Sequence, residues 1–156
     1  MSTVLELTRG SLVPQVDKLF EQYQRRDNIL LANVNASKIE EVLQHFICMQ
    51  EDRLFFILEI PANEKDEIKL RKSDRDPMHK DIYYIDGLTS EQALILLIRY
   101  GELLINDGLS KFGFGAHDGT AEIMRDKYNV ITLWSKEISK YDDFLKHTTS
   151  RWSMSV

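Results

Sequence analysis

The sequence predicts a single α+β domain: a mostly antiparallel sheet of about six strands with about four helices. The 156 residues fit one domain. Short apolar runs bounded by turn residues alternate with amphipathic runs at helical spacing. Three strand-like runs follow one another between residues 111 and 135, so a C-terminal three-stranded meander is expected.

The first third of the chain mixes helical and strand patterns. A helical pattern at 14–23 precedes a strand-like apolar run at 28–34. Ser37 and Glu40 then match a capping box, which predicts that a second helix begins there. The apolar run at 53–61 is typical of a buried strand that stops at a proline.

Residues 62–81 are expected to form a charged surface loop. Six acids and six bases stand there among few residues that a core could use. A short edge strand at 67–71 is the alternative within this segment. The run that starts at Lys80 then reads as a strand that ends in a turn at Asp86-Gly87.

The strongest helical pattern lies between Thr89 and Gly108. Thr89 and Gln92 match a capping box, and Gly108 is a helix stop signal. The polar stripe contains one apolar residue, Ile95, which is therefore expected to be exposed. The remaining surface is apolar, so the helix is expected to be largely buried. Gly101 interrupts it, which indicates close packing against another element.

The segment 111–125 has the pattern of a β-hairpin. Asp118-Gly119 predicts a two-residue type I′ turn. The register that this turn imposes places five apolar side chains on one face of the sheet: Phe112, Phe114, Ala116, Ala121 and Ile123. Gly113 and Gly115 leave the other face bare, so that another backbone can approach closely.

The C-terminal elements follow from the same patterns. A strand at 130–134 is apolar on both faces and is expected to be central. A short helix capped by Ser135 is expected at 136–148, buried through Ile138, Tyr141, Phe144 and Leu145. The tail 148–156 is expected to fray.

Composition narrows the class of protein. The only cysteine is Cys48, which excludes an internal disulfide; we expect it to be a partly buried structural thiol. The N-terminus lacks a signal-peptide pattern, and the longest apolar run is too short to span a bilayer. A cytoplasmic protein without membrane contact is therefore expected.

Charge argues against nucleic acid as a direct partner. The net charge is −5, and residues 86–126 carry seven acids and three bases. Two interpretations of this acidic block remain open. It is a solvated surface, or it is a docking face for a basic protein.

Catalytic and metal-binding patterns are weak. The glycines of 113–119 lack a P-loop lysine and stand within a strand. His117, Asp118 and Glu122 are the candidate metal ligands, but His117 and Glu122 are not directly opposed across the turn and no second histidine lies nearby in sequence. No catalytic residue, metal or cofactor is therefore predicted.

The runs KDIYYIDGLTSEQALILL and LLINDGLSKFGFGAHDGTAEIMRDKYNVITLWS, within residues 80–147, resemble bacterial immunity proteins. These small proteins are encoded beside the secreted toxins of polymorphic and contact-dependent growth inhibition systems. The resemblance implies a cytosolic, non-enzymatic protein that binds and blocks one cognate toxin domain, commonly a nuclease. It carries over no defined functional residues.

The predicted partner-binding residues follow from charge and exposure. They are Asp86, Glu91, Ile95, Asp107, His117, Asp118 and Glu122. In this hypothesis an acidic face covers the basic cleft of a nuclease and blocks it sterically. The alternative is an enzyme or small-molecule-binding domain with a site near the 111–125 hairpin. The sequence predicts no oligomeric state.

Overall fold

The computed structural model describes residues 5–9, 21–75, 78–145 and 153–154, and one sheet of eight strands lies at its centre. The strand order is β4-β3-β5-β6-β7-β2-β1-β8, and all neighbours are antiparallel except the pair β1–β8. The strands are β1 (Gln22–Arg26), β2 (Ile29–Asn33), β3 (Leu54–Pro61), β4 (Lys80–Leu88), β5 (Lys111–Ala116), β6 (Ala121–Arg125), β7 (Val130–Ser135) and β8 (Ser153–Met154). The helices are α1 (Ile39–Met49), α2 (Glu64–Leu70) and α3 (Ser90–Asn106), with 3-10 turns η1 (Ala36–Lys38) and η2 (Ile138–Tyr141).

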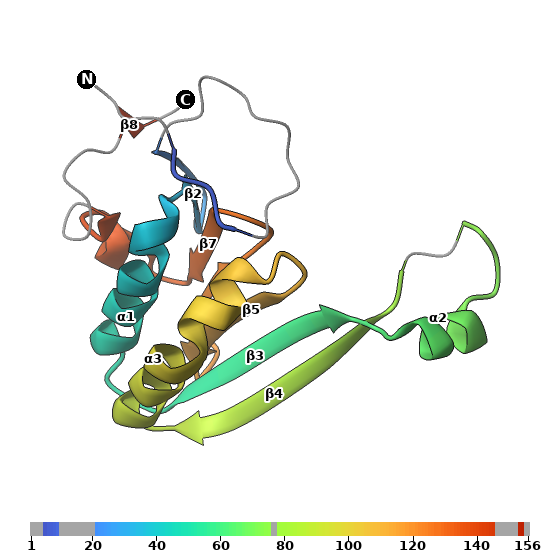
Figure 1. Cartoon of the computed structure of the whole chain (residues 1–156). Helices are drawn as coiled ribbons and strands as arrows, with labels where there is room; N and C mark the ends of the chain where they lie inside the picture. Colours follow the sequence, from blue (N-terminus) through green and yellow to red (C-terminus); the bar gives the residue numbers. More distant parts are fainter. Residues whose placement is uncertain (1–4, 10–20, 76–77, 146–152, 155–156) are drawn as a thin grey trace.

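The core lies between the sheet and two helices. α1 and α3 lie side by side over one face of the sheet, whereas α2 stands apart at the far end of the β3–β4 ribbon (Figure 1). We call the face opposite α1 and α3 the open face. The five hairpin side chains predicted to share one face are all buried on the helix side: Phe112, Phe114, Ala116, Ala121 and Ile123.

The predicted α+β class is confirmed, and β5, β6 and β7 form the expected meander. All six expected strands are present, with β7 in a central position, and β1 and β8 are additional. Residues Gln22–Arg26 form β1, so the helix expected at 14–23 is wrong at its end, where Tyr23 pairs with Ala32. The rest of that helix lies outside the described residues, apart from Glu21.

The tail 148–156 was expected to fray. Ser153 and Met154 instead pair in parallel with Gln22 and Tyr23, because the edge of β1 offers them backbone partners. The other residues of this tail lie outside the described part of the chain.

The charged segment 62–81 contains a helix, so both the loop and the edge strand expected at 67–71 are wrong. Asn63 caps α2 by accepting a hydrogen bond from the Asp66 N–H at 2.9 Å. Glu67 is buried, and its carboxylate accepts a hydrogen bond from the backbone N–H of His79 at 2.9 Å. This contact connects α2 to the start of β4. It also explains why Glu67 is buried, which the charged composition of the segment did not predict.

α1 shows the expected amphipathic burial, but it begins differently. Its buried side chains are Ile39, Val42, Leu43, Phe46 and Ile47. The capping box of Ser37 and Glu40 is absent, because η1 precedes the helix and moves its N-cap to Lys38, which makes no side-chain cap. Cys48 is exposed, not partly buried, because it points away from this stripe.

α3 has the predicted capping box of Thr89 and Gln92, and Gly108 follows its end with a φ of 75°. Gly101 packs against α1, where a β-carbon would lie 3.1 Å from Glu40 Oε1. The helix is nevertheless not largely buried. α1 and the sheet cover only one side of it, and its outer side carries the exposed side chains of Ile95, Ile98 and Leu103.

The β5–β6 hairpin has the predicted register, with Phe112 opposite Arg125. The type I′ turn is wrong, because only Gly119 has positive φ and four residues, 117–120, connect the strands. Gly113 and Gly115 do not leave a bare strip. Their open-face positions are filled by Met124 and by the ring of Phe55, although the Ile123 carbonyl also approaches Gly113 closely.

The helix expected at 136–148 is a 3-10 turn, η2, followed by further turns up to residue 145, the last described there. The expected Ser135 cap is wrong, because Glu137 precedes η2 and makes no side-chain cap; Ser135 ends β7, where its hydroxyl accepts from the Glu137 N–H at 3.1 Å. The expected apolar anchors are all buried: Ile138, Tyr141, Phe144 and Leu145. These side chains pack the segment against α1, where the rings of Phe46 and Tyr141 are in contact.

Candidate functional site

Two of the predicted site residues meet at one end of the sheet. Asp86 Oδ1 lies 2.7 Å from Nδ1 of His117, which follows β5. The register between β3 and β4 shifts between Ile85 and Leu88, and Gly87 there has a φ of 74°. Gly87 therefore forms a β-bulge inside β4, not the turn that was expected to end the strand.

The contact changes the pKa of both partners. The hydrogen bond to Asp86, followed by its negative charge, raises the pKa of His117 above 6.5. The same hydrogen bond lowers the pKa of Asp86. Asp86 is thus engaged by a histidine of its own chain, whose protonated form offsets the charge of the carboxylate.

Two other predicted carboxylates hold turns together. Asp118 Oδ1 accepts hydrogen bonds from the backbone N–H and the hydroxyl of Thr120, at 3.0 and 2.6 Å. Asp107 Oδ1 accepts from the N–H groups of Leu109 and Ser110, both at 2.8 Å. Each carboxylate accepts hydrogen bonds from nearby backbone N–H groups and so stabilises its own turn. This role in the fold limits how far either carboxylate can serve a partner.

The remaining predicted residues are spread over the molecule. Glu122 is half-buried on the open face, where burial raises the pKa of its carboxyl group. Glu91 lies in the first turn of α3, and Ile95 is exposed on the same helix, as expected. Asp107 caps the other end of α3, about 24 Å away for a helix of this length. The structure therefore brings together Asp86, His117 and Asp118 but does not join all seven residues in one site.

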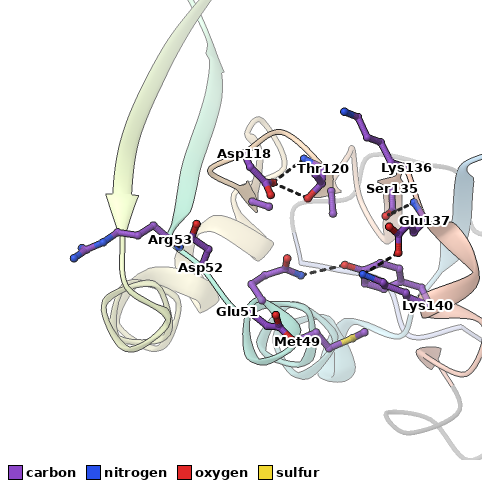
Figure 2. Close-up of a pocket in the computed structure, with 14 residues that line it drawn as sticks. Met49, Glu51, Asp52, Arg53, Asp118, Thr120, Ser135, Lys136, Glu137 and Lys140 are labelled. Atoms are coloured by element: carbon purple, nitrogen blue, oxygen red, sulfur yellow. Dashed lines mark hydrogen bonds and ion pairs between the residues drawn. The ribbon is translucent and has the colours of Figure 1, made fainter.

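A pocket of about 480 Å³ lies beside the β5–β6 turn (Figure 2). The end of α1, the turn that leads from it to β3 and the segment after β7 form its walls. Its polar groups are largely paired with one another. Lys140 contacts Glu137 at 2.9 Å, and Gln50 donates to the Tyr141 hydroxyl at 3.1 Å.

The side chains that line this pocket include acids, bases and hydroxyl groups. Its charged side chains are of both signs, and Asp118 is held by Thr120. In the described ranges no three His, Cys, Asp or Glu side chains are close enough to hold a metal ion. The three side chains weighed as candidate ligands, His117, Asp118 and Glu122, do not form such a group. The small-molecule alternative would place its ligand in this pocket, beside the β5–β6 turn.

The outer side of α3 exposes both large apolar and charged side chains. Ile98 and Leu103 are 66% and 67% exposed, and Ile95 lies between them on the helix surface. Three charged residues share this side: Glu91, Arg99 and Glu102. We call these six residues the α3 outer face.

The α3 outer face continues into a shallow hollow at the C-terminal half of the helix. The hollow measures about 560 Å³, and Arg9 and Arg99 line it with Leu103. Arg9 Nη2 lies 2.7 Å from Glu102 Oε1, and the Arg9 N–H donates to Asn106 at 2.9 Å. The face thus combines large apolar side chains with a charged rim, as protein interfaces do.

A second apolar surface lies along β4. Four consecutive side chains are between 46% and 61% exposed: Ile82, Tyr83, Tyr84 and Ile85. β4 is the outermost strand, and its outer edge has no strand partner among the residues that the structure describes. We call Ile82 to Ile85 the β4 edge.

Sequence reasoning missed both surfaces for the same reason. An apolar residue in a helix or strand pattern predicts burial, and nothing local in the sequence tells which elements lie at the rim of the fold. One signal was available in the strand run at Lys80. Four adjacent large apolar residues there cannot all face one core, because strand side chains alternate between faces.

Comparison of the chain with protein-family models, with curated proteins and with solved structures finds no match. None of the described helices is long and apolar enough to cross a membrane.

Proposed function

We propose that this protein is an immunity protein that binds one cognate toxin domain and blocks it. The exposed apolar side of α3 is the observation that carries the proposal. Exposing Ile98 and Leu103 costs free energy unless a partner covers them, since burying a large aliphatic side chain is worth about 1.5–3 kcal/mol.

The charge around this surface favours a basic partner. The charged side chains on this surface and in its hollow are Glu91, Glu102 and Asp107 against Arg9 and Arg99, an excess of one acid. Such an excess attracts a positively charged protein and accelerates its association. A nuclease domain presents a basic cleft to its nucleic acid, so it is a partner with the required charge.

Inhibition in this proposal is steric. In the described part of the chain no cluster of His, Cys, Asp or Glu side chains could hold a metal ion near the α3 outer face. Docking there places the mass of the α1–α3 layer and the sheet behind it over the partner's cleft. The substrate of the toxin is then excluded without any chemistry by the inhibitor.

Growth protection in cells tests the proposal. The partner is first captured from the native host with the wild-type protein, and its toxin domain is then expressed in cells that carry this protein. The wild type should protect, whereas the double variant Ile98→Asp with Leu103→Asp should not, because two charges cannot be buried at the interface.

A matched control uses α2, where Ile68 and Leu70 are 72% and 52% exposed. The double variant Ile68→Asp with Leu70→Asp changes charge and exposed apolar area in the same way, away from α3, and should still protect. Equal protection by both double variants would place the interface elsewhere. Failure of the wild type to protect would overturn the proposed function.

A further inference from the structure

The β4 edge lacks the residues that usually prevent an edge strand from pairing with another strand. It belongs to a strand of nine residues, whose free side exposes backbone donors and acceptors to any matching strand. Natural edges are protected by prolines, charges or bulges. In β4 the charges Lys80 and Asp81 stand at one end and the Gly87 bulge at the other, so Ile82 to Ile85 have no protection.

We propose that the β4 edge pairs with the β4 edge of a second copy of this chain, which joins the two sheets into one. The pairing is antiparallel about a two-fold axis perpendicular to the sheet. That symmetry keeps the helix side of both sheets on the same side. Residues that face each other across the joint therefore come from the same face of β4.

The faces of β4 follow from its pairing with β3. Ile85 and Tyr83 lie opposite Phe56 and Leu58 and share the helix side. Ile82 and Tyr84 project from the open face instead. Only registers centred on a single residue satisfy the symmetry, so the candidates are those that place Ile82, Tyr83 or Tyr84 opposite its own copy.

Charge complementarity selects the register centred on Tyr83. This register places Lys80 opposite Asp86 at both ends of the joint and Ile82 opposite Tyr84 in its middle. The register centred on Tyr84 would place Asp86 opposite Ile82, and the one centred on Ile82 would place Lys80 opposite Tyr84. In the Tyr83 register one type of pair places a charged residue opposite an apolar one, namely Asp81 opposite Ile85.

The two charged groups are available for this contact. Lys80 Nζ is 3.9 Å from Glu59, a loose contact for an exposed side chain. Asp86 uses Oδ1 for His117 and has a second carboxylate oxygen. The strand is complementary to itself in this register. A second copy of the chain therefore matches both its apolar and its charged positions, and no other partner is needed to explain the surface.

Cysteine crosslinking tests the register. In a Cys48→Ser background, Tyr83→Cys should form a disulfide-linked dimer under mild oxidation, since directly opposed strand residues lie within disulfide reach. Ile82→Cys and Tyr84→Cys alone should crosslink far more slowly, because each lies two residues out of register with its copy. An equal mixture of these two chains should crosslink to each other.

Charge exchange tests the end contacts. Lys80→Asp alone and Asp86→Lys alone should each weaken the dimer by roughly two- to tenfold in sedimentation equilibrium, and the double variant should restore it. Circular dichroism checks that each variant is folded. Because Asp86→Lys also removes the His117 contact, the restoration by Lys80→Asp is the decisive readout.

Three results would overturn the inference: a monomer at every concentration, crosslinking that does not depend on position, or loss of captured partner protein on substitution of the β4 edge with no change in self-association. The last would assign the edge to a different protein. The first two leave the α3 outer face and its protection assay untouched, so failure of the dimer is distinguishable from failure of the proposed function, whereas the last would also move the toxin-binding surface to the β4 edge.

Discussion

Arg125 shows how one residue closes the hairpin onto the helix layer. It lies opposite Phe112 on the apolar side of β6 and is fully buried. Its Nη2 donates to the carbonyls of Leu104 and Ser110 at 2.8 and 2.7 Å, which satisfies the C-terminal end of α3. The guanidinium also lies 5.4 Å from the centre of the Phe112 ring, within cation–π range.

Removing this guanidinium should destabilise the protein without changing its surface. Arg125→Met keeps the apolar stem but leaves several buried carbonyl groups unpaired, at about 1–3 kcal/mol for each lost partner. Urea unfolding of the two proteins measures the difference. A midpoint that does not change would mean that water replaces the guanidinium at the end of α3.

The Asp86–His117 pair should make stability depend on pH. His117 has a raised folded pKa, so its contribution is complete below 6.5 and is lost as the pH rises through the folded value. Asp86 has a lowered pKa, so its contribution is present above 3.8 and is lost as the pH falls through the folded value. The pair therefore stabilises the fold most between these two pH values.

An NMR titration of the His117 imidazole checks this prediction. Its pKa should lie above 6.5 in the wild type and should fall when Asp86→Asn removes the negative charge. Asp118→Asn is the control, since Asp118 is a minor influence on His117 and is engaged by Thr120. Equal titration in all three proteins would contradict the contact.

At the scale of the elements, two interior glycines should respond in opposite ways to alanine. A β-carbon on Gly113 would lie 1.9 Å from the Ile123 carbonyl oxygen in the paired strand, and backbone in a sheet cannot move aside. A β-carbon on Gly101 meets the ends of the flexible Glu40 and Leu97 side chains at 3.1 and 3.2 Å.

Gly113→Ala should therefore unfold at markedly lower temperature than the wild type. Gly101→Ala should match it or exceed it, since alanine in a helix gains up to about 1 kcal/mol over glycine. Thermal unfolding of the two variants side by side measures the contrast. The opposite order would show that the strand relaxes and the helix pair does not.

Elements with a strong local signal were predictable from the sequence. The register of β5 and β6 followed from Asp118-Gly119 and the alternation of apolar residues, even though the turn has a different conformation. The cap at Thr89 was equally local. α2 was not predictable, because its burial depends on the contact of Glu67 with His79, twelve residues away in the chain. β8 depends on an edge formed 131 residues earlier, at Gln22.

The candidate site was predictable only in part. Ile95 is exposed as its helical position indicated. The acids were chosen by charge, but Asp107 and Asp118 are engaged by backbone donors that their neighbours supply only after folding. Exposure of Ile98 and Leu103 depends on how far α1 and the sheet extend, which no single segment of sequence determines.

The whole molecule presents two apolar surfaces with different geometry. The α3 outer face lies on the helix layer, on the side of α3 opposite the residues that it buries, and the β4 edge lies at the rim of the sheet (Figure 1). A strand edge suits pairing with another strand, whereas the convex side of a helix suits a cleft. The two surfaces can therefore serve two contacts at once, one with a second copy and one with a toxin domain.

The affinity of the captured toxin domain for matched variants tests the central claim most directly. Biolayer interferometry should give a 1:1 complex with the wild type and an unchanged dissociation constant for Ile68→Asp with Leu70→Asp. The dissociation constant for Ile98→Asp with Leu103→Asp should rise about 30-fold or more, the loss expected of a central interface contact. Equal dissociation constants for the two double variants would contradict the assignment of the α3 outer face as the toxin-binding surface.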